Sequence, residues 1–205
     1  MDAAVETILA EYEAREAREW DEVRRRPDGH PLDVDDMLIS VGRATGTLLN
    51  LLAKEAGARR ILEIGTSYGY STVWLAEAAR ATGGTVISLE IHPKKRDYAL
   101  AALGRAGLAA HADLRLGDAR ARIAALPGPF DFVLVDLWKN LYIPCFDLVL
   151  PKLAPGALIA ADNMTFPEMS RAEAAAYRAH VRTAPHIESV LLPVGSGVEL
   201  SRYAP

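Results

Sequence analysis

The stretch Arg60-Ile-Leu-Glu-Ile-Gly-Thr-Ser-Tyr-Gly-Tyr-Ser71 decides the fold of this chain. It begins as a short apolar strand and continues into a loop with glycines at positions 65 and 69, after which residues 72–81 carry apolar side chains at helical spacing. Glycines let the backbone approach a ligand closely, and a helix N-terminus directs free N–H groups at it. We therefore predict a ligand-binding corner between a strand and a helix.

The spacing of these glycines argues against a dinucleotide. The dinucleotide fingerprint is G-x-G-x-x-G, whereas Thr66, Ser67 and Tyr68 separate the two glycines here, and Tyr70 follows where the last glycine of the fingerprint would stand. An NAD oxidoreductase is therefore the weakest interpretation of the loop.

Two acidic residues frame the loop. Glu63 precedes Gly65, and Glu90 ends the next apolar run, residues 85–90. A carboxylate at the tip of the second strand can accept hydrogen bonds from both ribose hydroxyls of a nucleoside. A carboxylate before the glycines would repel phosphate but suits a cationic or amino-bearing group. The pair favours S-adenosylmethionine over NAD as the cofactor.

Composition narrows the class of protein. The chain has 205 residues, of which 50% are hydrophobic, and a net charge of −4. This length and content fit one globular domain, and the acidic balance argues against a protein that binds nucleic acid through phosphates. The single cysteine, Cys145, excludes an intrachain disulfide. With no apolar run as long as a membrane span, we expect a cytoplasmic protein without nucleic-acid or membrane partners.

The chain has an N-terminal and a core region. Residues 2–26 have the pattern of an amphipathic helix, which Pro27-Asp28-Gly29 stops, and a second helix capped by Asp33 or Asp35 should end at Gly57. We treat residues 1–205 as a single domain, in which 1–56 supply helices over the carboxyl edge of the sheet and 57–205 form the cofactor-binding core. The apolar helices are also compatible with a homodimer.

From Arg59 onward, strands and helices alternate. This alternation predicts an α/β, Rossmann-like, doubly wound sheet of seven strands, mostly parallel, with helices on both faces and ligands at the carboxyl ends of the strands. Gly195-Ser196-Gly197 should turn the last two strands into an antiparallel hairpin at the sheet edge. The predicted strands are 59–64, 85–90, 112–116, 130–136, 156–161, 187–194 and 198–203, and the predicted helices of the core are 71–82, 94–106, 119–126, 139–153 and 170–183.

Polar residues follow the ends of the later strands. Gly117-Asp118-Ala119 ends the third, and its backbone and Asp118 can meet an adenine edge. The fourth ends at Asp136 and the fifth at Asp162, which Asn163 follows. Because these strand ends can be neighbours, three oxygen ligands can come together and suit Mg²⁺. A cation between two buried carboxylates would also offset the energetic cost of burying them.

Several motifs resemble one family. The run Leu-Glu-Ile-Gly-x-x-x-Gly-Tyr-Ser at 62–71 resembles the cofactor loop of class I methyltransferases. Asp136-Leu-Trp-Lys-Asn-Leu-Tyr142 resembles the Asp-x-x-Lys-x-x-Tyr segment of the metal-dependent catechol and caffeoyl-CoA O-methyltransferases, and Ala161-Asp-Asn-Met164 resembles their second metal segment. Together the similar motifs span residues from about 35 to the C-terminus.

The resemblance implies roles for individual residues. Asp136, Asp162 and Asn163 would hold Mg²⁺ or another divalent cation, and Lys139 would be the catalytic general base. Glu90 would hold the ribose and Trp138 would lie against the adenine. The residues predicted to bind S-adenosylmethionine are Val41, Gly42, Glu63, Gly65, Ser71, Glu90, Asp118, Ala119, Asp136 and Trp138.

The implied reaction is methyl transfer to a hydroxyl of a catechol-like aromatic molecule. A phenol is a poor nucleophile at neutral pH, because its pKa is near 10 by analogy with tyrosine, and a bound metal ion lowers that pKa. The alternatives are a metal-independent methyltransferase of another small metabolite and a non-catalytic S-adenosylmethionine-binding protein. Residues 164–170 are shorter than the segment that helps the caffeoyl-CoA branch recognise its acceptor, and Phe166 and Pro167 can form an apolar wall there instead.

Overall fold

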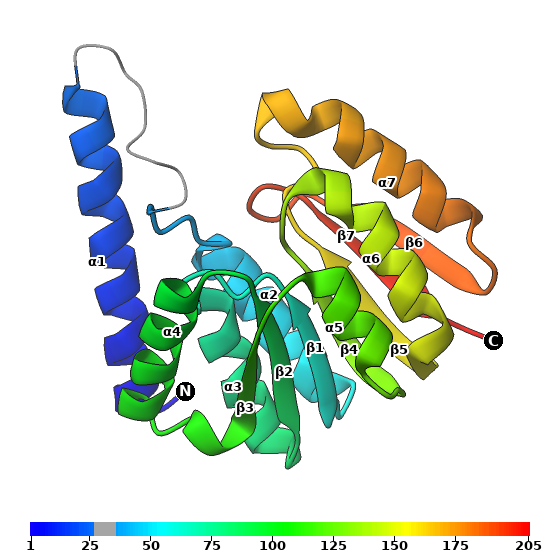
Figure 1. Cartoon of the computed structure of the whole chain (residues 1–205), viewed down its shortest axis with the longest axis horizontal. Helices are drawn as coiled ribbons and strands as arrows, with labels where there is room; N and C mark the ends of the chain where they lie inside the picture. Colours follow the sequence, from blue (N-terminus) through cyan, green and yellow to red (C-terminus); the bar gives the residue numbers. More distant parts are fainter. Residues whose placement is uncertain (27–35) are drawn as a thin grey trace.

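The computed structural model describes residues 1–26 and 36–205. Within them, one sheet has the strand order β3-β2-β1-β4-β5-β7-β6 (Figure 1). The strands β1 to β5 are parallel, and β7 lies antiparallel between β5 and β6. The doubly wound sheet and its C-terminal hairpin are therefore confirmed. The strands are β1 (Arg60–Ile64), β2 (Thr85–Glu90), β3 (Ala112–Leu116), β4 (Phe130–Val135), β5 (Leu153–Ala161), β6 (Ile187–Leu192) and β7 (Val198–Tyr203).

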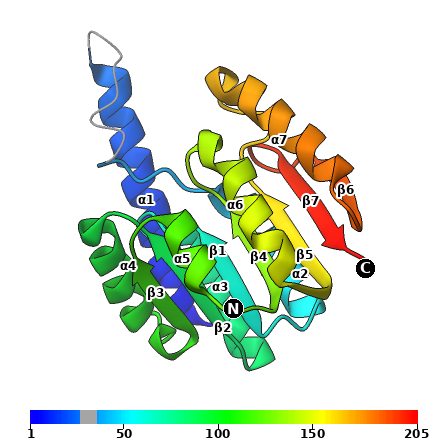
Figure 2. The same ribbon diagram turned by 45° about the vertical axis from the view of Figure 1, so that its right-hand side comes forward.

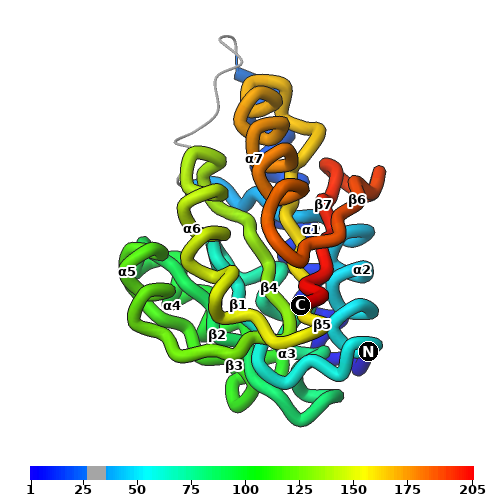
Figure 3. The backbone as a smooth tube through the Cα atoms, turned by 90° about the vertical axis from the view of Figure 1, so that its right-hand side faces the viewer, coloured from blue at the N-terminus to red at the C-terminus, as the bar shows by residue number. Residues whose placement is uncertain are grey.

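Helices cover both faces of the sheet, and each face has its own buried core. On one face, apolar residues of α1 to α4 pack together with Phe132 and Leu134 of β4. On the other face, α5 to α7 pack on Val133 and Val135, the alternate residues of the same strand. Figure 3 shows α2 and α6 on opposite sides of the strands. The helices are α1 (Ala3–Arg25), α2 (Gly42–Glu55), α3 (Tyr70–Thr82), α4 (Pro93–Arg105), α5 (Ala119–Ala125), α6 (Tyr142–Val149) and α7 (Arg171–Thr183).

The N-terminal region differs from the prediction. Residues 36–41, which we call the crossing segment, are not helical, and α2 begins only at Gly42. Gly42 has a φ of +76°, and a right-handed helix cannot continue through a residue with that backbone. The predicted stop at 27–29 and the predicted caps Asp33 and Asp35 lie outside the described residues.

The crossing segment, rather than the two N-terminal helices, lies at the carboxyl edge of the sheet. Its residues 38–41 line a cavity together with Gly65 and Asp136. The helices α1 and α2 belong instead to the core on the α3 face. The far end of α1 rises above α4 (Figure 2), and Glu16 and Glu19 of this helix contact the crossing segment.

The predicted helix 139–153 is interrupted. Residues Lys139–Leu141 form a 3-10 turn, α6 follows, and a second 3-10 turn covers Leu150–Lys152. A continuous α-helix from Lys139 would place Pro144 in its interior, where proline lacks the N–H donor and clashes with the preceding turn, whereas the first turn of α6 tolerates it. As a result, Lys139 lies on a turn rather than inside a regular helix.

Within the described residues, no helix combines the length and the apolar character needed to cross a membrane.

We expect Gly46→Ala to lower the free energy of unfolding by about 1–3 kcal/mol. A Cβ at Gly46 would lie 2.4 Å from Nε1 of the buried Trp74 side chain, and the cost of this overpacking exceeds the gain in helix propensity. Gly104→Ala is the matched control, because no heavy atom of the described residues outside the local backbone of α4 lies within 4 Å of its Cβ position. That change should stabilise the protein by about 0.5–1 kcal/mol. Urea denaturation measures the free energy of unfolding of both variants. Equal changes in the two would contradict the packing argument.

Candidate active site

The glycine loop is held against the end of β4. Gly65 has a φ of +107°, and a Cβ there would lie 1.8 Å from the carbonyl oxygen of Asp136. The N–H groups of Gly65 and Thr66 both donate to the carbonyl of Leu89, each over 3.1 Å. Only glycine permits this backbone and this approach, so the loop connects the ends of β1, β2 and β4.

Glu63 lies beneath the loop in a shell of hydroxyl groups. Its carboxylate accepts hydrogen bonds from Ser71 Oγ over 2.6 Å, from Thr72 Oγ1 over 2.5 Å and from Ser88 Oγ. Burial raises the pKa of Glu63 to about 7, against the opposing effect of these three donors. The side chain is fully buried and lines neither of the two cavities described below.

A cavity of about 400 Å³ opens at the carboxyl ends of β1 to β4. Glu90 stands at its wall, where its carboxylate accepts backbone N–H groups of Ser67, Ile91 and His92. Trp138 is 60% exposed and lies on the rim. The cavity therefore has an acidic group and an aromatic surface, as a nucleoside site requires. The predicted cofactor residues that line it are Gly65, Glu90, Asp118, Ala119, Asp136 and Trp138.

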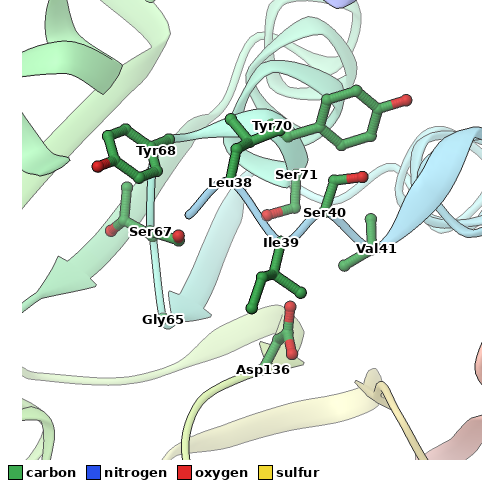
Figure 4. A pocket seen from close by; sticks show the side chains of 11 residues that line it. Leu38, Ile39, Ser40, Val41, Gly65, Ser67, Tyr68, Tyr70, Ser71 and Asp136 are labelled. Carbon is green, nitrogen blue, oxygen red and sulfur yellow. The ribbon is translucent and has the colours of Figure 1, made fainter. Parts of the chain in front are cut away.

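A smaller cavity of about 20 Å³ lies between the glycine loop and the crossing segment. Ile39 points from the crossing segment toward Asp136, while Ser71 lies between the loop and the segment (Figure 4). Both Ile39 and Asp136 also line the larger cavity, so the two cavities adjoin. Val41 lines the smaller one, whereas Gly42 lines neither.

Two acidic groups meet where β4 and β5 end. The N–H of Asp162 donates to the carbonyl of Val135, which brings it next to Asp136. Both carboxyl groups are buried enough that desolvation raises their pKa values, that of Asp162 to about 8. Neither carboxylate oxygen of Asp162 has a hydrogen-bond partner among the described residues. Unpartnered buried carboxylates are costly, so this arrangement fits a cation.

Asn163 completes the oxygen cluster. Its φ of +56° lies in the left-handed region, which asparagine tolerates better than most residues and which is frequent at functional sites. Among the described residues, no three His, Cys, Asp or Glu side chains gather as a metal site. A metal ion here would therefore depend on two carboxylates and one amide oxygen, which is a donor set suited to Mg²⁺.

Lys139 faces this cluster. Its Nζ donates to the hydroxyl of Tyr142 and to Oδ1 of Asn163, the latter over 3.2 Å. Burial lowers the pKa of Lys139, while the charges of Asp136 and Asp162 oppose that shift. Tyr142 is fully buried and donates to the carbonyl of Asp162 over 3.2 Å. The lysine is thus positioned by its neighbours and is easier to deprotonate than an exposed lysine.

Sequence reasoning overlooked part of the cavity wall. Ser67 lines both cavities with a φ of +48°, and its place inside the glycine loop was a signal that could have found it. Met37 and Ile39 had no such signal, because the crossing segment was interpreted as helix. Other lining residues not predicted as site residues are His92, Lys95 and Leu141.

The chain belongs to the O-methyltransferase family, whose sequence model matches residues 11–204. A catechol O-methyltransferase of Niastella koreensis is 41% identical in an alignment of 133 positions that covers 62% of this chain and 58% of the relative. A caffeoyl-CoA O-methyltransferase of Zea mays is 29% identical over 92% of this chain and 77% of the relative. The match thus spans under two thirds of the length of that catechol relative. The resemblance predicted from the motifs is confirmed.

Solved structures agree with this assignment. The O-methyltransferase of Bacillus cereus in complex with SAH has a TM-score of 0.76 and 27% identity, covering 99% of this chain and 91% of that one. An O-methyltransferase of Streptomyces achromogenes, in complex with SAM, has a TM-score of 0.78 and 26% identity, covering 100% of this chain and 91% of that one. Together with the family match, they rule against the NAD oxidoreductase.

We expect Glu63 to make the free energy of unfolding depend on pH. Its carboxyl group titrates near 4.5 in an unfolded chain and at about 7 in the folded protein, so the folded state binds the proton more tightly. The stability present below pH 4.5 is lost as pH rises to about 7, by up to about 3 kcal/mol at 1.36 kcal/mol per pKa unit.

Urea denaturation of wild type and Glu63→Gln between pH 4.5 and 8 measures this loss. Glutamine does not titrate, so the stability of wild type minus that of the variant should fall as pH rises and level off above pH 7. Other acidic groups, such as Asp136, titrate in both proteins and largely cancel. A pH-independent difference would contradict the raised pKa of Glu63.

Proposed function

We propose that this protein is an S-adenosylmethionine-dependent O-methyltransferase that transfers a methyl group to one hydroxyl of a catechol-like molecule with the help of a divalent cation. The observation that carries the proposal is the pair of carboxylate oxygens of Asp162 that have no partner among the described residues, which lie beside Asp136, Asn163 and the half-buried Lys139. This cluster adjoins a cavity with the features of a nucleoside site. The family and the cofactor-bound structural neighbours support the same activity.

The larger cavity suits the nucleoside part of S-adenosylmethionine. Glu90 would accept the ribose hydroxyls, Trp138 would cover the adenine, and Asp118 and Ala119 would border the adenine edge. The methionine part would extend toward the smaller cavity, where Ser71 and the backbone at Val41 lie. Because Asp136 lines both cavities, the reacting end of the cofactor would lie next to the carboxylate cluster.

Asp136, Asp162 and Asn163 would hold the divalent cation. When bound, such a cation lowers the pKa of a coordinated hydroxyl group and S-adenosylmethionine supplies an electrophilic methyl group. The two carboxylates account for the net negative charge that a cation neutralises. An acceptor with two adjacent hydroxyls is favoured, because both oxygens can occupy positions that the three protein ligands leave free.

Lys139 would act as the general base. Its lowered pKa makes the neutral amine accessible, and the free electron pair of Nζ would take the proton of the acceptor hydroxyl. The hydroxyl of Tyr142 and the amide of Asn163 orient Nζ. Burial raises the pKa of Tyr142 well above its usual value, so Tyr142 stays neutral and serves as a fixed partner. Placing the acceptor oxygen in line with the methyl carbon and its sulfur leaving group, with Nζ beside that oxygen, would be the largest contribution of the protein.

Two other readings make different predictions. A metal-independent methyltransferase would turn over in the presence of EDTA. A non-catalytic S-adenosylmethionine-binding protein would show no change in any property when Lys139 is replaced. Neither explains why both carboxylate oxygens of the buried Asp162 lack partners among the residues that the structure describes.

We expect Mg²⁺ to stabilise wild type but not Asp162→Asn. At a concentration of about 100 times the Kd, a ligand adds about 2.7 kcal/mol, which raises the Tm of a protein of this size by about 5–10 °C. The metal-free variant should melt above metal-free wild type at pH 8.5, because it has lost an unpartnered buried charge. The control is Asp147→Asn, which changes an exposed carboxylate that pairs with His180. This variant should keep the full response to Mg²⁺. Differential scanning calorimetry with Mg²⁺ and with EDTA measures these Tm values. If Mg²⁺ left the Tm of wild type unchanged, the metal would have to be removed from the proposal.

We expect Lys139→Met to lower kcat for a simple catechol by about 10²–10⁴-fold, the usual contribution of a general base. The affinity for S-adenosylhomocysteine should stay within twofold, because Lys139 lines neither cavity. Lys54→Met is the control, because Lys54 of α2 forms an ion pair with Glu77 of α3. This variant should retain wild-type turnover. Steady-state kinetics and calorimetric titration give the two quantities. Full activity of Lys139→Met would exclude the assigned role.

A further inference from the structure

The crossing segment is a wall of both cavities. Met37 and Ile39 line the larger one, and residues 38–41 line the smaller one. The segment has neither helical nor sheet hydrogen bonds of its own, so its backbone N–H groups need other partners. The position of the crossing segment, and with it this wall of the two cavities, therefore depends on those partners.

Two glutamates of α1 supply these partners. Glu19 accepts the N–H of Leu38 over 2.6 Å, and Glu16 accepts the N–H of Ser40 over 2.8 Å. Glu16 also accepts the hydroxyl of Ser40 over 2.6 Å. Arg15 holds Glu19 in place through an ion pair of 2.6 Å. None of these three α1 residues lines either cavity.

The spacing of the two glutamates matches the segment. Residues three apart lie on one face of a helix, and the N–H groups of the alternate residues Leu38 and Ser40 both donate toward α1. Glu16 and Glu19 therefore meet Ser40 and Leu38 in antiparallel order. The intervening Ile39 points the other way, toward Asp136 (Figure 4).

The hydrogen bonds continue into α2. Ser40 Oγ, which donates to Glu16, accepts the N–H of Gly42 over 3.2 Å. The carboxylate of Glu16 thus fixes both Ser40 and the start of α2, where Val41 borders the smaller cavity. Displacing Glu16 would release the part of the wall nearest the methionine end of the cofactor.

We infer that Glu16 and Glu19 are positioning residues for cofactor binding, which act through the backbone of the crossing segment without touching the ligand. The inference rests on the proposed function, because it takes the smaller cavity as the methionine site. It assigns to α1 a role in affinity for S-adenosylmethionine in addition to its packing on α3 and α4.

The test compares Glu16→Ala, Glu16→Gln and Glu6→Ala by calorimetric titration with S-adenosylhomocysteine. Glu16→Ala should weaken binding by about tenfold, which corresponds to the loss of hydrogen bonds to a charged acceptor. Glu16→Gln should stay within about threefold of wild type, because its amide can accept the N–H of Ser40 and donate to Ser40 Oγ. Glu6→Ala removes an ion pair between α1 and Arg43 of α2 and should leave the affinity unchanged.

Thermal melting of the same variants separates positioning from folding. We expect Glu16→Ala and Glu6→Ala to lower the Tm by similar small amounts while only the former loses affinity. Unchanged affinity in Glu16→Ala, or an equal loss in Glu16→Gln, would overturn the inference. Failure of wild type to bind S-adenosylhomocysteine at all would instead contradict the proposed function.

Discussion

The backbone of Gly65 lies against the carbonyl of Asp136, and the site depends on this approach. A single methyl group at residue 65 would collide with that oxygen at 1.8 Å. The glycine loop after β1 thus packs directly on the end of β4, where the N–H of Asp136 also donates to the carbonyl of Ile64 over 2.9 Å. Asp136 therefore belongs at once to the walls of both cavities and to the oxygen cluster with Asp162. Methyl donor and acceptor need this adjacency, since transfer between them requires contact in line.

Three buried acids near this contact differ in how their charge is balanced. Glu63 has three hydroxyl donors, and Glu90 has three backbone N–H donors. Asp162 has none for its side chain within the described residues. The carboxylate of Glu63 is therefore held inside the protein and that of Glu90 is fixed at the wall of the larger cavity, whereas the unpartnered carboxylate of Asp162 carries the full cost of burial. Glu63 thus supports the loop from within, which distinguishes it from Glu90 at the cavity wall and from Asp162, whose oxygens have no partner among the described residues.

Much of the site could be predicted because of how parallel sheets are built. Apolar periodicity located the strands, and parallel strands bring their carboxyl ends to one edge, so Glu90, Asp136 and Asp162 could be placed near one another without coordinates. The crossing segment was misassigned for an equally physical reason. Leu38, Val41 and Thr45 have helical spacing, but the positive φ of Gly42 interrupts a helix, and glutamates of α1 accept the backbone N–H groups of Leu38 and Ser40. A local pattern does not contain a partner that lies more than fifteen residues away.

The sequence by itself determined the order of strands and helices, the terminal hairpin and the oxygen-bearing residues at the strand ends, because these follow from local periodicity, glycine and strand polarity. Only the tertiary structure decided which acids have hydrogen-bond donors and which segment lines the two cavities. Those outcomes depend on which donors burial brings next to each carboxylate, as Ser88 meets Glu63 and Ser40 meets Glu16. Such pairs are separated by more than twenty residues in the chain, so only the packing of the helices on the sheet can select them.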